Sequence, residues 1–197
     1  MSGLHPAYPL RTERLELRPH RREDLDDLLA FHSDPEIVRY VPWPVRDREQ
    51  TRVALEAKLK QDRLTEEGQW LVLAIELRET GTVIGEVLLK WASEADQQGE
   101  LGYALHGGYH GKGLAAEAAR EMLRLGFEEL GLHRIVAILD DRNTASAQLL
   151  ERLGMRREAH HLQALWFKDE WCNEFVYALL KDEWLSARSG SAASDRG

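Results

Sequence analysis

The amino-acid sequence predicts a single mixed α/β domain. The chain has 197 residues, which suits one domain with a sizeable core. Segments that alternate apolar and polar residues, as strands do, are interspersed with segments that have the spacing of amphipathic helices. Their order is strand, two helices, three strands, helix, strand, helix and two strands, which is typical of a mixed domain.

The N-terminal third is expected to hold one strand and two helices. Residues 1–10 are interpreted as a loose lead-in, and residues 12–18 (TERLELR) alternate as a half-buried strand does. Residues 22–32 carry apolar side chains at near-helical spacing, and residues 47–64 are expected to form the second helix. Between these helices lies an aromatic loop, residues 40–44, which two prolines stiffen.

Three strands and a long helix are expected in the middle of the chain. Residues 70–77 (WLVLAIEL) and 83–90 (VIGEVLLK) flank a Glu-Thr-Gly-Thr turn, so they are predicted to form a hairpin. Residues 99–105 (GELGYAL) form the third strand of this group. Residues 114–130 are predicted to be a helix that Gly131 closes.

The C-terminal part is expected to contain three strands and one helix. Residues 134–140 (RIVAILD) are a compact apolar strand, and Asn143 or Thr144 caps a helix that ends at residues 153–154. Two further strands are expected at residues 156–167 and 170–180.

The last residues differ in composition from the rest. Residues 186–197 (SARSGSAASDRG) are small and polar, so we expect a disordered tail. The domain itself is therefore placed at residues 11–185.

Composition narrows the class of protein. Hydrophobic residues make up 43% and charged residues 30% of the chain, as in an ordinary globular protein. Cys172 is the only cysteine, which excludes an intrachain disulfide and a thiolate zinc cluster. No apolar run is long enough to cross a bilayer and the N-terminus lacks a signal core, so a cytoplasmic protein without membrane contact is expected.

The net charge of −8 argues against nucleic-acid binding. It is compatible with a cationic substrate, but a role in solubility alone is the favoured interpretation.

A glycine-rich loop is the most informative local feature. The stretch from Ala104 to Arg120, ALHGGYHGKGLAAEAAR, places four glycines and Lys112 between a strand and a helix. The first N–H groups of a helix lack intrahelical partners and the helix dipole adds positive potential, so this position favours an anion. Glycines let the backbone approach the anion closely. A phosphate or pyrophosphate is the expected guest.

Two known nucleotide-binding loops are candidates for this stretch, and each departs from it in one respect. The mononucleotide loop needs a hydroxyl residue after its lysine, whereas Gly113 follows Lys112. The dinucleotide fingerprint G-x-G-x-x-G/A fits Gly111, Gly113 and Ala116, and Asp140 ends the next strand, where a ribose-binding acid would lie. Five residues separate the preceding strand from that fingerprint, however, so an NAD(P)-dependent oxidoreductase is the weaker alternative.

The third candidate is a coenzyme A loop. Residues 110–115 (HGKGLA) resemble the Q/R-x-x-G-x-G/A motif of the GNAT superfamily of N-acetyltransferases. Other segments resemble its ribosomal-protein N-terminal (Rim-type) branch, in the same order along the chain: residues 12–19, 100–105, 116–118, 143–155 and 181–184. This resemblance implies a mostly antiparallel sheet that is splayed at its centre and flanked by helices.

The resemblance also implies acetyl-CoA as cosubstrate. Backbone groups of the strand before the loop would pair with the pantetheine arm, and the loop would hold the pyrophosphate. Asn143 would bind pantetheine, although asparagine is also a favoured helix cap. The expected contacts are Tyr103, Ala104, Leu105, His110, Gly111, Lys112, Gly113, Leu114, Ala115, Ala116, Asn143, Ser146 and Arg152.

The reaction implied is direct attack by a neutral amine in a ternary complex. Ser146 would stabilise the leaving thiolate, because Leu150 stands where many relatives have a tyrosine. Glu100 is the leading candidate for the general base, directly or through a water. The alternatives are His110, His160 and His161. No metal-ligand spacing is present, so no metal is expected.

The acceptor is the least defined part. It would be a protein N-terminal α-amino group or a small cationic amine such as a polyamine or an aminoglycoside. Trp43, Trp166 and Trp171 are candidate acceptor contacts, and each equally suits packing. Asn173 stands where the family often has aspartate, which weakens the case for ribosomal-protein specificity. A non-catalytic coenzyme A-binding module is the alternative from another class, and the sequence is compatible with a homodimer.

Overall fold

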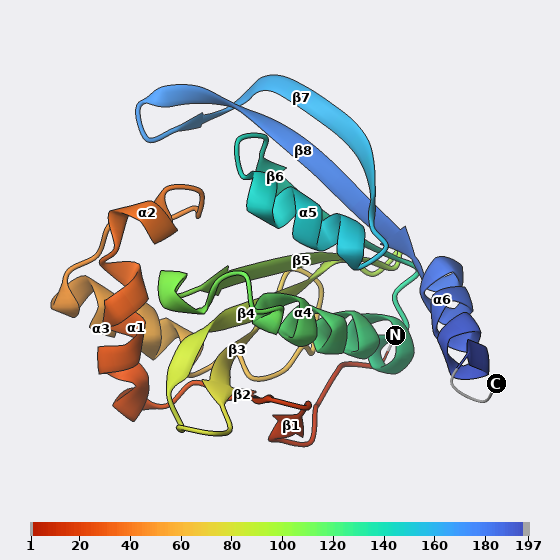
Figure 1. The fold of residues 1–197 in the computed structure, drawn as a ribbon, viewed down its shortest axis with the longest axis horizontal. Coiled ribbons are helices and arrows are strands. Elements are labelled where there is room, and N and C mark those ends of the chain that lie inside the picture. Colours follow the sequence, from red (N-terminus) through yellow and green to blue (C-terminus); the bar gives the residue numbers. More distant parts are fainter. Residues whose placement is uncertain (1, 195–197) are drawn as a thin grey trace.

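The protein is built around one eight-stranded sheet (Figure 1). The computed structural model describes residues 2–194. The strand order is β1-β2-β3-β4-β5-β6-β8-β7, and every neighbouring pair is antiparallel except β5–β6 among the described residues. The predicted mixed α/β class, with a mostly antiparallel sheet, is confirmed.

Most strands begin and end where the apolar runs of the sequence do. The strands are β1 Leu10–Arg11, β2 Leu15–Pro19, β3 Trp70–Leu77, β4 Val83–Ser93, β5 Gln98–Leu105, β6 Arg134–Asp140, β7 Arg156–Phe167 and β8 Glu170–Leu180. The strand predicted at residues 12–18 is β2, which starts at Leu15. It starts later than predicted because Thr12 makes a turn, donating from its N–H to the Leu15 carbonyl at 3.0 Å.

The helical segments depart more from the sequence-based prediction. They are η1 Arg22–Asp24, α1 Leu25–His32, α2 Pro35–Val38, α3 Arg48–Lys58, η2 Gly107–Tyr109, α4 Leu114–Arg124, η3 Leu125–Leu130, α5 Thr144–Arg152 and α6 Lys181–Ser194. The second predicted helix was too long: α3 ends at Lys58, because Leu64 pairs with Leu4 in an isolated β-bridge.

Two α-helices were not expected. Asp34 and Pro35 begin α2, where the Asp34 carboxylate accepts a hydrogen bond from the N–H of Glu36. Helix α6 continues to Ser194, so the prediction of a disordered tail is wrong for residues 186–194. Residues 195–197 lie outside the described part.

Helices cover both faces of the sheet. Helices α4 and α5 pack on one face, over the larger apolar core, and α1 and α3 pack on the other, over a smaller cluster around Phe31 and Ala74. Figure 1 shows α1, α2 and α3 grouped at one end of the sheet.

The sheet opens at its centre, between β5 and β6. Strand β5 is paired with β4 along its length, but it is paired with β6 only from Gln98 to Glu100. Beyond Glu100, β6 stays with β8 and diverges from β5, as Figure 1 shows. The last residues of β5 therefore have one edge without a strand partner.

Candidate active site

A cavity of about 740 Å³ lies at this opening. Its walls come from the end of β5, the glycine loop with the start of α4, helix α5, and α2 with the residues after it. A volume of this size is typical of a small-molecule site.

The cavity brings together nearly all the residues predicted to contact coenzyme A. Those lining it are Tyr103, Ala104, Leu105, His110, Gly111, Gly113, Leu114, Ala115, Ala116, Asn143, Ser146 and Arg152. Lys112 does not line it: its Nζ donates to the Gly108 carbonyl at 3.0 Å and lies 5.2 Å from the centre of the Tyr109 ring. This lysine therefore braces the loop from outside.

The glycine loop has the backbone geometry of an anion site. Gly111 and Gly113 have φ values of 73° and 76°, a region that disfavours side chains. Helix α4 makes its first hydrogen bond from the N–H of Glu117 to the Gly113 carbonyl. The N–H groups of residues 114–116 therefore make no hydrogen bond within the helix. They lie at its N-terminus, the positive end of the helix dipole, which borders the cavity.

The glycine loop is anchored by the turn between β1 and β2, a contact that the sequence did not predict. Glu117 accepts from Thr12 Oγ1 at 2.6 Å and from Arg14 N and Nε, both at 2.8 Å. Arg14 also donates to the Lys112 carbonyl at 2.9 Å. Burial raises the pKa of Glu117, but these donors outweigh it and hold the pKa below its usual value.

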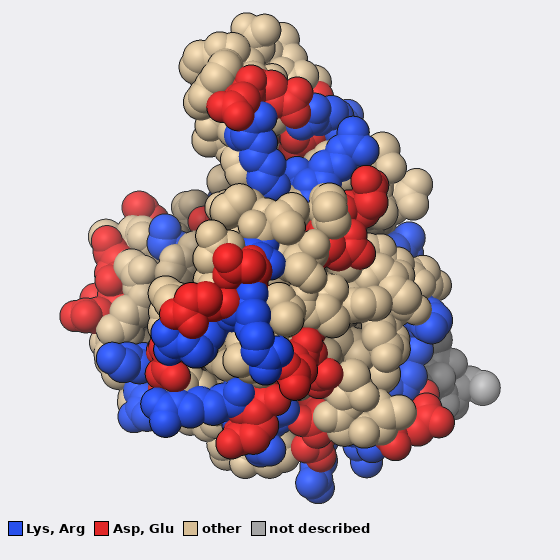
Figure 2. Space-filling view, turned by 90° about the vertical axis from the view of Figure 1, so that its left-hand side faces the viewer, with Lys and Arg blue, Asp and Glu red and all other residues tan. Residues whose placement is uncertain are grey.

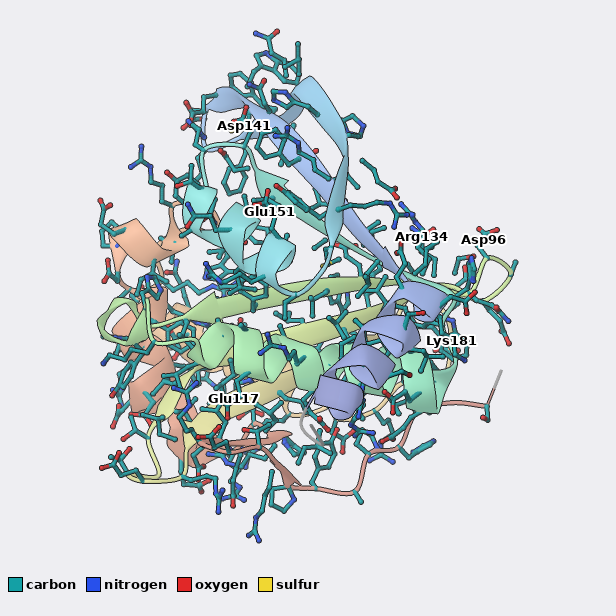
Figure 3. All side chains as sticks on the ribbon, turned by 45° about the vertical axis from the view of Figure 1, so that its right-hand side comes forward. Asp96, Glu117, Arg134, Asp141, Glu151 and Lys181 are labelled. Carbon is teal, nitrogen blue, oxygen red and sulfur yellow. The ribbon has the colours of Figure 1, made fainter. Side chains whose placement is uncertain are left out.

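Figure 3 shows Glu117 on the side of α4 that faces the N-terminal strands. No sequence signal links it to Arg14, because the two residues are 103 positions apart.

His110 occupies the position where the GNAT motif has Gln or Arg. Its Nε2 lies 2.8 Å from the Leu105 carbonyl oxygen, so its N–H ties the start of the loop to the end of β5. The side chain therefore fixes the mouth of the cavity.

Two hydroxyls meet at the cavity, that of Ser146 from α5 and that of Tyr103 from β5. The Asn143 Oδ1 accepts from Ser146 N at 3.1 Å, which confirms the predicted helix cap and leaves the amide N–H₂ of Asn143 free to serve as a donor. The Tyr103 hydroxyl lies 2.7 Å from Ser146 Oγ. Burial raises the pKa of Tyr103 to about 12, although Ser146 and Arg152 oppose the rise. The sequence predicts a contact only through the backbone of Tyr103, whereas the structure adds its side-chain hydroxyl.

Glu100 does not line the cavity. It lies half-buried at the last residue of β5 that pairs with β6, opposite Lys90 in the β4 register. Burial raises its pKa above the usual value; Lys90 lowers it and Glu174 raises it further. Because alternate residues of a strand share a face, Glu100 and Ala104 lie on the face opposite Tyr103.

Two of the other predicted bases, His160 and His161, lie on β7. His160 Nε2 lies 2.9 Å from Asp141 Oδ2, and Asn173 donates to the same oxygen at 3.0 Å. Figure 3 places Asp141 beneath the β7–β8 hairpin. His161 is exposed on β7. Neither histidine lines the cavity.

The structure does not bring the three predicted acceptor tryptophans into the cavity. Trp43 faces inward, with its ring centre 5.5 Å from that of His32, whereas its neighbours Tyr40 and Val41 line the cavity. Trp166 and Trp171 are 56% and 57% exposed near the hairpin tip, edge to face at 5.4 Å.

The hairpin that carries these two tryptophans reaches toward α2. It forms the lobe at the top of Figure 2, above a face where acidic and basic side chains are interspersed. Next to its turn, Lys168 Nζ donates to the Val38 carbonyl of α2. The hairpin is thereby tied to the wall of the cavity.

Other chemistries find little support in the part of the chain that is described. Residues 2–194 contain no group of three or more His, Cys, Asp or Glu arranged to hold a metal ion. None of the helices described there is long and apolar enough to cross a membrane. Cys172 is buried, and burial raises the pKa of its thiol.

The fold and the cavity together define an acetyltransferase. Residues 14–156 match the family model described as an acetyltransferase (GNAT) domain, so the chain belongs to the GNAT family. The dinucleotide alternative is wrong: β5, α4 and β6 do form one parallel βαβ unit, but every other pair of neighbouring strands in the described residues is antiparallel, unlike the parallel sheet of a dinucleotide-binding domain.

Individual relatives cover nearly the whole chain. The uncharacterized N-acetyltransferase YnaD of Bacillus subtilis is 31% identical over 89% of this chain and 98% of its own length. The uncharacterized N-acetyltransferase p20 of Bacillus licheniformis is 34% identical over 89% of this chain and 97% of its own. Among solved structures, a GNAT-family acetyltransferase of Bacillus anthracis is 28% identical, with a TM-score of 0.79 over 88% of this chain and 98% of that one.

Proposed function

We propose that this protein transfers the acetyl group of acetyl-CoA to a primary amine, either a protein N-terminal α-amino group or a small cationic amine. The observation that carries the proposal is the cavity at the opened edge of β5, with the glycine loop at one end. The homodimer and the cytoplasmic location that the sequence favours remain predictions.

The free edge of β5 suits the pantetheine arm. Beyond Glu100 its backbone has no strand partner on the β6 side, so the amides of pantetheine can pair there as an added strand would. The N–H groups of residues 111–116 would then hold the pyrophosphate, with Asn143 and Arg152 on the opposite wall.

The chemistry is one nucleophilic substitution. The neutral amine attacks the thioester carbonyl carbon, a β5 backbone N–H stabilises the oxyanion, and the carbon–sulfur bond breaks as the tetrahedral intermediate collapses. The thiolate of coenzyme A leaves beside Ser146, whose hydroxyl donates a hydrogen bond to it. Tyr103 supports this step because its hydroxyl lies 2.7 Å from Ser146 Oγ.

Glu100 is proposed to take the proton of the amine through a water. It shares a strand face with Ala104, and its raised pKa brings it nearer to neutrality than an ordinary glutamate. An α-amino group, with a pKa of about 7.7–8.0, needs less help than a lysine at about 10.4.

The acceptor is proposed to enter between α2 and the hairpin. Asp34 and Glu36 add acidic side chains to this wall, which favours a cationic acceptor. Trp166 and Trp171 would form an exposed rim above the acceptor, and Trp43 would support its own loop from the interior.

Thermal stabilisation and thiol release test the proposal. Coenzyme A is expected to raise the melting temperature and NAD(P) is not. Thiol release from acetyl-CoA is then measured against N-terminal peptides, polyamines, aminoglycosides and amino acids. Coenzyme binding with no release across the whole panel would instead favour a non-catalytic coenzyme A-binding module.

A further inference from the structure

A cluster of polar side chains is buried between the sheet and helices α1 and α3. We call it the buried polar cluster; its members are His20, His32, Trp43, Lys58 and Glu86. Glu86 and His32 have no exposed surface, and His20 and Lys58 are 4% and 9% exposed. The five residues come from five separate parts of the chain between β2 and β4.

Most polar side-chain atoms of this cluster have no hydrogen-bond partner among the described residues. Lys58 Nζ donates to Glu86 Oε2. Among the described residues, no hydrogen bond reaches Glu86 Oε1, the Trp43 indole nitrogen or either ring nitrogen of His20 and His32. The nearest nitrogens of the two histidines lie 3.8 and 4.0 Å from Glu86 Oε2, which is too long for a hydrogen bond.

Unpaired polar atoms in a protein interior are costly, and they are usually satisfied by ordered water. The unpaired set here includes a donor, the indole N–H, and an acceptor, the Glu86 oxygen. A water molecule can accept from the indole N–H and also donate to the Glu86 oxygen, whereas a bound ion can satisfy only one of these two groups. The Lys58 ammonium also balances the Glu86 carboxylate, so the pair itself calls for no counter-ion.

The charges support this assignment. Burial acts to raise the pKa of Glu86, but Lys58, His20 and His32 together outweigh burial and hold the pKa below its usual value. Burial lowers the pKa of His32 to about 4, so its ring is neutral at pH 7 and keeps one nitrogen as an acceptor.

The cluster lies directly behind the acceptor end of the cavity. Glu86 pairs with Ala104 across β4 and β5, so the two share a face, and Ala104 lines the cavity. Trp43 belongs to the loop of residues 40–46, whose Tyr40 and Val41 also line it. Lys58 Nζ lies 5.5 Å from the centre of the Trp43 ring.

We propose that the buried polar cluster holds internal water molecules, and that the Lys58–Glu86 pair acts through them and Trp43 as a positioning device for the acceptor loop, residues 40–46. The second half of this inference rests on the proposed function. The first half does not, because it concerns only the interior of the protein.

A crystal structure at a resolution that shows ordered water tests the first half. At least one water is expected within hydrogen-bond distance of Glu86 Oε1 and of a nitrogen of His20, His32 or Trp43. A dry cluster with these atoms still unpaired would overturn the proposal, whether or not the protein is an acetyltransferase.

Kinetics of E86Q and K58M test the second half. Each is expected to raise the acceptor KM about tenfold, while acetyl-CoA affinity measured by calorimetry stays within about twofold. E121Q is the matched control, because it breaks the ion pair to Arg124 on α4, far from the loop. The double variant K58M/E86L separates positioning from stability: a wild-type acceptor KM in this apolar replacement would contradict the positioning role.

Discussion

The hydrogen bond between the Tyr103 and Ser146 hydroxyls carries the most direct prediction at the scale of single residues. S146A removes the group that meets the leaving thiolate, so kcat is expected to fall roughly 10- to 100-fold, the worth of one hydrogen bond to a charged group. Y103F keeps Ser146 and is expected to cost about tenfold or less. Steady-state kinetics with thiol detection measures both. Wild-type kcat for S146A at all pH values would contradict the assignment.

Glu100 predicts a specific pH dependence. A general base works only when deprotonated, so kcat/KM should fall as the pH drops through its raised pKa. E174Q removes a carboxylate that raises this pKa, so the acidic limb of the profile should move to lower pH. E100Q should abolish the limb. A profile that is the same in all three proteins would rule Glu100 out as the base.

His32 predicts a pH dependence of stability. Its pKa is about 4 in the folded protein and about 6.5 when unfolded, so the unfolded state alone binds its proton between these values. The free energy of unfolding should therefore fall by up to about 3 kcal/mol as the pH drops from 6.5 to 4. Urea titrations of H32Q should show a shallower fall, whereas H161Q, at an exposed site, should follow the wild type.

At the scale of elements, the glycine loop is the part whose backbone matters most. G113A places a side chain at a φ of 76°, and G81A does the same at 71° in the β3–β4 turn. Both should lose about 1 kcal/mol of stability or more. Only G113A should weaken coenzyme A binding, by at least tenfold. Isothermal calorimetry measures this, and equal affinities in the two variants would show that the loop does not hold the coenzyme.

Elements were predictable where the local signal was complete. Strands β6, β7 and β8 begin and end at the predicted residues, because each is an apolar or alternating run with turn residues at its ends. Helix α2 was missed because it has only one turn, and its existence depends on the Asp34 cap. Helix α6 was missed because small, polar residues are typical of a tail, although alanine favours helices.

Contacts between distant residues could not be predicted. Arg14 and Glu117 brace the glycine loop from 103 positions apart, and each alone has the sequence context of an ordinary surface charge. The buried polar cluster is likewise assembled by the fold. By contrast, twelve of the thirteen predicted coenzyme contacts line one cavity, because the motif residues lie next to one another in the sequence or on one helix.

At the scale of the whole molecule, coenzyme binding should stabilise the fold. A ligand at 100 times its Kd adds about 2.7 kcal/mol, provided that it binds only the folded state. For a chain of 197 residues this corresponds to a rise in melting temperature of roughly 5–10 °C. Differential scanning fluorimetry with coenzyme A measures it, and an unchanged melting temperature at millimolar coenzyme would contradict the assignment of the cavity.

The opened sheet has a further consequence for solubility. A strand edge without a partner is a template on which other chains can add, and proteins usually cover or blunt such edges. Here the bare edge of β5 is recessed: Ala104 and Leu105 are each only 6% exposed, and the diverging β6 and α5 stand on its other side. In the proposed complex the pantetheine arm would pair with this edge. Low exposure of the edge also limits the addition of strands from other chains.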